Sequence, residues 1–108
     1  MEIVEKRQEK GLVIEVRGRL DAQSSPQLEA RLKELFAAGE KALVFDFAGL
    51  SYMSSAGLRV LLIAFKQLGK GRVVLSGLQG PLVDIIEISG FRSFFPLAAD
   101  VPAALALL

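Results

Sequence analysis

The stretch between residues 41 and 68 constrains the fold more than any other part of the chain. Residues 41–47, KALVFDF, are almost continuously apolar, as in a strand that is covered on both faces. Residues 55–68, SAGLRVLLIAFKQL, repeat apolar side chains at helical spacing and precede a glycine that can end the helix. The main apolar stripe of this helix is expected to comprise Leu58, Leu61, Leu62, Phe65 and Leu68. A buried strand followed closely by an apolar helix is typical of a parallel sheet with crossover helices.

The rest of the chain repeats this alternation. Residues 2–7 and 12–18 have the pattern of two strands around a polar turn, which predicts an antiparallel hairpin. Helices are expected from about residue 25 to Gly39 and over residues 81–90, and a second buried strand over residues 72–77. RSFFPL would be a short edge strand, and DVPAALALL a closing helix capped by Asp100. Residues 1–108 are therefore predicted to form a single α/β domain, with a mixed, mostly parallel sheet of four to five strands and about four α-helices.

Two adjacent serines, Ser54 and Ser55, stand between the apolar strand and the apolar helix. The simplest interpretation is structural: Ser54 is the N-cap and satisfies one of the early helix amides. That interpretation leaves Ser55 unexplained, in a first turn where Ala56 and Gly57 leave the surface around a hydroxyl unshielded. A phosphate on Ser55 would meet free amides and the positive end of the helix dipole. Ser55 is therefore a candidate phosphorylation site.

Two carboxylates and two further serines form the other candidate positions. Asp21 lies in the loop between a strand and a helix, where it is either a loop-capping carboxylate or part of a binding surface. Either Ser25 caps the following helix, or Ser24 caps it in a capping box, and the sequence does not choose between them. Asp46 interrupts the apolar strand and is expected to accept backbone hydrogen bonds from the next turn, because a buried unpaired carboxylate would be costly.

Composition excludes several classes of function. The chain has 13 basic and 12 acidic residues, a formal charge of +1, so no strong overall field should attract nucleic acid or an anionic membrane. Without histidine or cysteine, neither a Ser-His-Asp nucleophile nor an ordinary zinc site can form. The longest apolar run, VLLIAF, is too short to cross a bilayer. We therefore expect a cytoplasmic binding protein rather than an enzyme, with no metal, no cofactor and no direct insertion into a membrane.

Three segments in order give the chain a resemblance to a known family. They are VRGRLDAQSSPQLEARL, LVFDFAGLSYMSSAGLRVLL and LVDIIEISGFRSFFPL, which together span nearly the whole sequence. The middle segment is the most specific, because it joins an aspartate-containing strand to a serine followed by Gly-Leu. In this pattern the chain resembles the STAS domain family, named for sulphate transporters and anti-sigma factor antagonists.

The resemblance implies a regulatory role in transcription. In single-domain members, the unphosphorylated protein binds a serine-kinase anti-sigma factor and so releases a sigma factor, phosphorylation breaks the complex, and a phosphatase restores it. By this resemblance Ser55 is the phosphoacceptor and Asp46 the strand aspartate. The predicted partner-binding residues are Asp21, Ser55, Gly57 and Leu58, which match the family pattern, together with Ser24, Ser54 and Arg59 beside them in the sequence.

This chain departs from the family pattern at one position. Many members have an aspartate immediately before the phosphoacceptor, whereas this chain has Ser54. The departure removes a negative charge and makes Ser54 the alternative acceptor. Other STAS members are associated with transporters, so the second functional hypothesis is a regulatory subunit of a permease or an ABC system.

Overall fold

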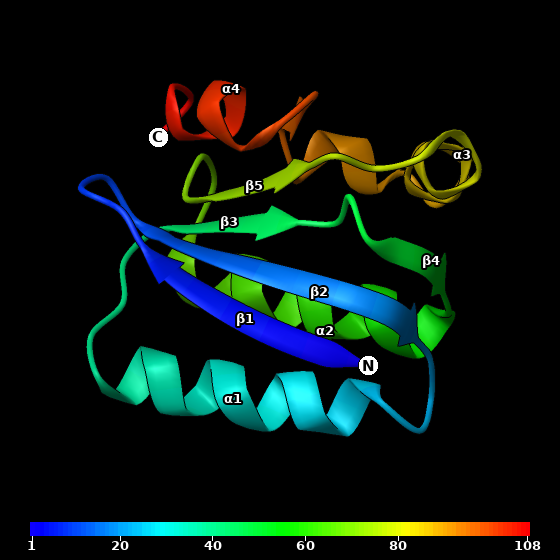
Figure 1. The fold of residues 1–108 in the computed structure, drawn as a ribbon, viewed down its shortest axis with the longest axis horizontal. Helices are drawn as coiled ribbons and strands as arrows, with labels where there is room; N and C mark the ends of the chain where they lie inside the picture. The colour runs from blue at the N-terminus through cyan, green and yellow to red at the C-terminus, as the bar shows by residue number, and fades with distance from the viewer.

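One mixed sheet organises the molecule. The computed structural model describes residues 1–108, and its six strands belong to a single sheet (Figure 1). The strands are β1 (Glu2–Arg7), β2 (Leu12–Leu20), β3 (Leu43–Asp46), β4 (Leu50–Met53), β5 (Val73–Ser76) and β6 (Leu97–Ala98). The order is β1-β2-β3-β5-β6, with β4 paired to β2 outside this path. Only the β1–β2 pair is antiparallel, so the predicted mixed, mostly parallel sheet is confirmed.

Strand β2 is long enough to pair with two strands along the same edge. Its first part pairs with β3, where Leu12 lies opposite Leu43, and its last part pairs with β4, where Leu20 lies opposite Met53. The register shifts between Gly18 and Arg19, where pairing with β4 begins. The sequence did not predict β4, and of the predicted edge strand over residues 92–97 only Leu97 lies in β6. The pairing of β4 brings the ends of β2 and β4 together at the carboxyl edge of the sheet.

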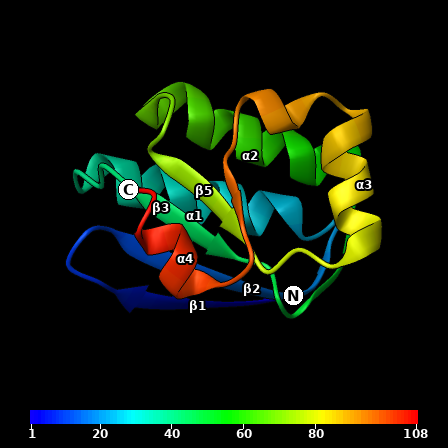
Figure 2. The same cartoon turned by 90° about the horizontal axis from the view of Figure 1, so that it is seen from above.

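The helices cover the sheet unequally. They are α1 (Ser25–Ala37), α2 (Ser55–Leu68), α3 (Gly80–Ile88) and α4 (Val101–Leu105), with a 3-10 turn, η1, at Phe91–Ser93. Helices α1 and α2 pack side by side against one face, α4 lies on the opposite face, and α3 stands at one end (Figures 1 and 2). None of these helices combines the length and apolar character that a membrane span requires.

Alternating strand side chains build two separate cores. Leu12, Ile14 and Val16 face α1 and α2 and belong to the larger core, as their period-2 pattern predicts. On the other face, Val13 joins a small cluster that α4 covers through Ala104. The buried residues of α2 are Gly57, Val60, Leu61 and Ala64, so its most buried stripe is rotated from the predicted one. Leu58, Leu62, Phe65 and Leu68 are only partly buried beside that stripe.

Aromatic side chains close the larger core behind α2. Phe95 is fully buried, and its ring meets the ring of Phe65 edge-on at 5.8 Å between centroids. Phe91 and Phe94 are partly buried around Phe95. These rings therefore hold the last connection of the chain against α2.

Candidate functional site

The candidate site lies where β2 and β4 end. The amide of Ser54 donates to the carbonyl of Leu20 at 2.9 Å, which continues the parallel pairing for one residue past β4. This bond holds the loop that contains Asp21 beside the first turn of α2. Two segments that are distant in the sequence, the end of β2 and the start of α2, therefore meet at the carboxyl edge of the sheet, where ligands of α/β proteins commonly bind.

Ser54 occupies the predicted N-cap position of α2 but does not act as predicted. Its backbone is extended, with φ −96° and ψ 176°, and its carbonyl accepts the first intrahelical bond from Leu58 at 3.0 Å. Its hydroxyl makes no cap hydrogen bond and is buried without a partner. The predicted cap hydrogen bond of Ser54 is therefore wrong, and this hydroxyl is shielded from any incoming reagent.

Ser55 has the opposite environment. It is the first residue of α2, and its side chain is exposed. The amides of Ser55, Ala56 and Gly57 precede the first intrahelical bond and have no acceptor within the helix. No acidic side chain lies in this first turn. An anion on the Ser55 hydroxyl would therefore meet the positive end of the dipole without a competing carboxylate.

Asp21 organises its own loop. Its Oδ1 accepts from the amides of Gln23 and Ser24, each at 3.0 Å, and its carboxylate lies 3.7 Å from the guanidinium of Arg19. The amide of Ser24 contributes most to holding the pKa of the Asp21 carboxyl below its ordinary value, and the hydroxyl of Ser24, the amide of Gln23 and Arg19 act in the same direction. Asp21 is half-buried, so its outer edge can still contact a partner.

Neither predicted cap of α1 makes a side-chain cap bond. Ser24 holds the N-cap position, but its hydroxyl lies 2.7 Å from the carbonyl of Arg19 and accepts from the amide of Asp21 at 2.9 Å. Ser25 begins the helix, and its buried hydroxyl has no hydrogen-bond partner. Ser24 therefore stabilises the loop beside the site rather than the helix amides.

The residues that follow Ser55 differ in their exposure. Gly57 is buried, and a Cβ added to it would lie 2.9 Å from Leu20 and 3.0 Å from Met53. This glycine allows α2 to approach the sheet closely and offers no side chain to the surface, in contrast to its expected role beside the hydroxyl. Leu58 is half-buried against the larger core, whereas Arg59 is exposed and reaches Glu29 of α1 at 2.8 Å.

Asp46 has the predicted local role. Its Oδ1 accepts a hydrogen bond of 3.1 Å from the amide of Ala48, in the turn between β3 and β4. The expectation that it would accept a backbone bond from the following turn is confirmed. Asp46 therefore shapes the connection into β4.

Arg19 and Tyr52 are two surface residues of this edge that the sequence did not single out. They lie opposite each other in the β2–β4 register, and the Arg19 guanidinium stands 4.2 Å from the centroid of the Tyr52 ring. Tyr52 is 38% exposed, one of few large apolar side chains at the surface. Recognition of residues 50–53 as a strand would have placed this aromatic residue at the site.

The comparisons with known proteins agree with this architecture. The family model described as the STAS domain matches residues 2–104. BtrV of Bordetella bronchiseptica, a candidate anti-sigma factor antagonist by name, is 41% identical over 97 residues, which cover 88% of this chain and 84% of BtrV.

Two solved structures have the same fold. An anti-sigma factor antagonist from Mycobacterium paratuberculosis superposes with a TM-score of 0.88 at 24% identity, over 97% of this chain and 91% of that one. The phosphorylated form of SpoIIAA, a Bacillus cell fate determinant, has a TM-score of 0.69 at 21% identity, over 91% of this chain and 92% of that one. With a family model that matches nearly its full length, this chain belongs to the STAS domain family.

Proposed function

We propose that this protein is an anti-sigma factor antagonist that is switched by phosphorylation of Ser55. In the unphosphorylated state, the carboxyl edge of its sheet binds a serine-kinase anti-sigma factor and releases a sigma factor for transcription. The contrast between the exposed hydroxyl of Ser55 and the buried hydroxyl of Ser54 is the observation that carries the proposal. The name of BtrV and the phosphorylated form of SpoIIAA support the same function and the same kind of switch.

The chemistry requires only an accessible hydroxyl from this chain. The Ser55 oxygen attacks the γ-phosphorus of ATP bound to the kinase, an oxygen–phosphorus bond forms, and the bond to the β,γ-bridging oxygen breaks to release ADP. The hydroxyl proton passes to a base of the kinase, which also holds the nucleotide and Mg²⁺. A phosphatase reverses the modification by hydrolysis. The absence of histidine from this chain is therefore compatible with the reaction.

The phosphate would break the complex by electrostatics and desolvation. It adds close to two negative charges to a surface that a partner must cover, and those charges lose water when the partner binds. The first-turn amides and the dipole of α2 stabilise the phosphate in the free protein, which favours the dissociated state. The proposed partner surface comprises Asp21, Ser24, Ser55, Leu58 and Arg59, with Ser54 contributing atoms other than its buried hydroxyl, while buried Gly57 sets the position of α2 beneath it.

The test uses a kinase-type anti-sigma factor from the same organism, ATP and mass spectrometry of the modified protein. One phosphate on Ser55 is expected in the wild type and in Ser54→Ala, and none in Ser55→Ala. Ser55→Ala should retain its affinity for the anti-sigma factor. Ser55→Glu should bind the anti-sigma factor at least about tenfold more weakly, a loss of about 1.4 kcal/mol of binding free energy. Phosphate found on Ser54 instead, or full affinity of the phosphorylated protein, would refute the switch.

A further inference from the structure

The basic side chains of the protein divide into two groups with different environments. Ten salt bridges engage eight of the 13 basic residues. The other five, which form no salt bridge and are all exposed, are Lys10, Lys41, Lys66, Lys70 and Arg72. Each belongs to a segment at the amino end of the parallel strands: the β1–β2 turn, the approach to β3, the last turn of α2 and the α2–β5 connection. This end lies opposite to Ser55.

The charge of the molecule is therefore segregated in space. With Arg7, Glu9 and Glu40, the amino end holds six basic and two acidic side chains, a formal charge of +4, which leaves −3 on the rest of a chain whose total is +1. The helix dipole accounts for Lys66, the only cation in the last turn of α2, but its effect decays within that turn. The dipole therefore gives no reason for the four cations outside the helices.

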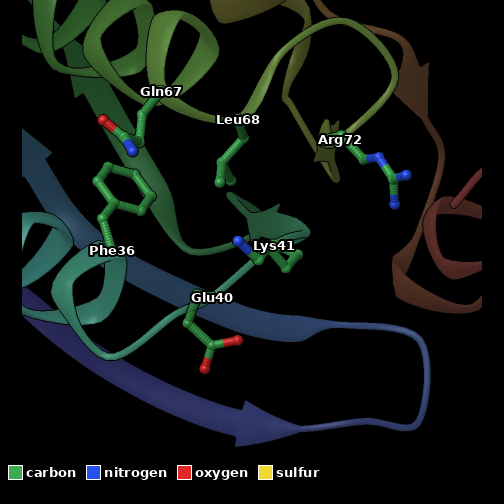
Figure 3. A pocket seen from close by; sticks show the side chains of 6 residues that line it. All are labelled: Phe36, Glu40, Lys41, Gln67, Leu68 and Arg72. Atoms are coloured by element: carbon green, nitrogen blue, oxygen red, sulfur yellow. The ribbon is translucent and has the colours of Figure 1, made fainter.

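A hollow of about 370 Å³ opens between the C-terminal ends of α1 and α2 within this basic surface. Its lining residues are Phe36, Glu40, Lys41, Gln67, Leu68 and Arg72. Figure 3 shows the Lys41 ammonium pointing toward the space between Phe36 and Leu68. A second hollow of about 230 Å³ shares Glu40, Lys41 and Arg72 and extends to Lys10. The first hollow thus places two apolar side chains beside unpaired cations, and the second, which is mostly polar, adds a further unpaired cation.

This lining selects the chemistry of an occupant. Phe36 and Leu68 are the two apolar residues of the lining, and a bare phosphate would leave them without an apolar contact. Glu9 and Glu40 divide the cations into short groups, and Glu40 is paired with Arg7, so the surface lacks the many regularly spaced cations through which a continuous polyphosphate backbone binds. A peptide that alternates carboxylates with apolar side chains matches both features.

We propose that the amino end of the sheet is a docking surface for a short acidic segment of a partner protein. The segment places an apolar side chain between Phe36 and Leu68 and its carboxylates against Lys41 and Arg72. The surface is separate from the phosphorylation site, so the proposal does not rest on the switch at Ser55.

The test is an NMR titration of the ¹⁵N-labelled full chain with a synthetic peptide whose two ends are blocked. The peptide consists of glycines around one leucine that has glutamates on both sides. Amide shifts should centre on Lys41, Gln67 and Arg72. The double variant Lys41→Gln/Arg72→Gln should weaken binding about tenfold, because each exposed ion pair contributes a few-fold. The control is Arg17→Gln/Lys33→Gln, which makes the same change in net charge at cations that are already paired, and should leave binding nearly unchanged.

Three controls test the chemistry of the peptide and the independence of this surface from Ser55, and two other ligands test the class of occupant. A peptide with glutamine in place of glutamate and one with glycine in place of leucine should each bind more weakly, and Ser55→Glu should bind like the wild type. The proposal is overturned if both double variants lose affinity equally, or if shifts centre elsewhere. It is also overturned if a twelve-residue oligothymidylate or phosphatidylserine vesicles bind more tightly than the acidic peptide.

Discussion

Replacement of Ser54 by alanine distinguishes a capping serine from a buried, unpartnered one by the sign of the stability change. Mutation of an N-cap serine to alanine lowers the free energy of unfolding by about 0.5–2 kcal/mol, because a helix amide loses its acceptor. The Ser54 hydroxyl makes no such bond and is buried without a partner. Burial of an unsatisfied polar group costs about 1–3 kcal/mol, and alanine removes that cost. We therefore expect Ser54→Ala to increase the free energy of unfolding by about 1 kcal/mol, or to raise Tm by roughly 4 °C.

Urea unfolding followed by far-ultraviolet circular dichroism measures this change, provided that the m-value stays constant. Asp100 supplies the matched control, because its side chain accepts a real cap bond from the amide of Ala103 at 2.9 Å. Asp100→Ala should lower the free energy of unfolding by about 1 kcal/mol. If Ser54→Ala lowers the free energy of unfolding by a similar amount, the Ser54 hydroxyl caps α2 in solution. The contrast between a buried, unpartnered Ser54 hydroxyl and an exposed Ser55 hydroxyl is then refuted.

Two further predictions concern the structure beneath and beside the site. Gly57→Val should destabilise the protein by about 1–3 kcal/mol in urea, because its Cβ would press on Leu20 and Met53; unchanged stability would place α2 farther from the sheet than the structure has it. The pKa of Asp21 is lowered in the folded state, chiefly by the amide of Ser24, so its contribution to stability is present above the ordinary carboxyl pKa and is lost as pH falls below about 4. Asp21→Asn should therefore lose less stability than the wild type between pH 4 and pH 2, and an ordinary pKa for Asp21 by NMR titration would contradict this.

The alternation of strands and helices could be predicted because each long element carries its own periodicity. β4 could not, because it has only four residues, of which Ser51 and Tyr52 are exposed. Such a segment has neither a buried run nor a regular alternation, and it becomes a strand only by pairing with the end of β2. The pairing includes a register shift between Gly18 and Arg19, with Ser51 as the extra residue of β4, and it joins segments that are distant in the sequence.

The sequence predicted the site residues better than their orientation. The order of Ser54 and Ser55 before an apolar helix indicated one cap position and one first-turn residue, and the structure has both. Gly57 was expected beside the hydroxyl, whereas it faces the core. The helix accommodates several apolar stripes because most of its residues are apolar, so its rotation follows from packing against β2 and β4 rather than from periodicity.

Net charge was the least informative part of the sequence, because the fold separates charges that the sum cancels. The separation also bears on how the two proposed surfaces act together. Helix α2 spans 14 residues, about 21 Å, between Ser55 and the hollow at its other end. The Debye length at physiological ionic strength is about 8 Å, so a phosphate on Ser55 is screened almost completely over that distance. Phosphorylation should therefore release a partner from the carboxyl edge while an acidic segment stays bound at the amino end, which allows one small domain to keep one partner as it exchanges another.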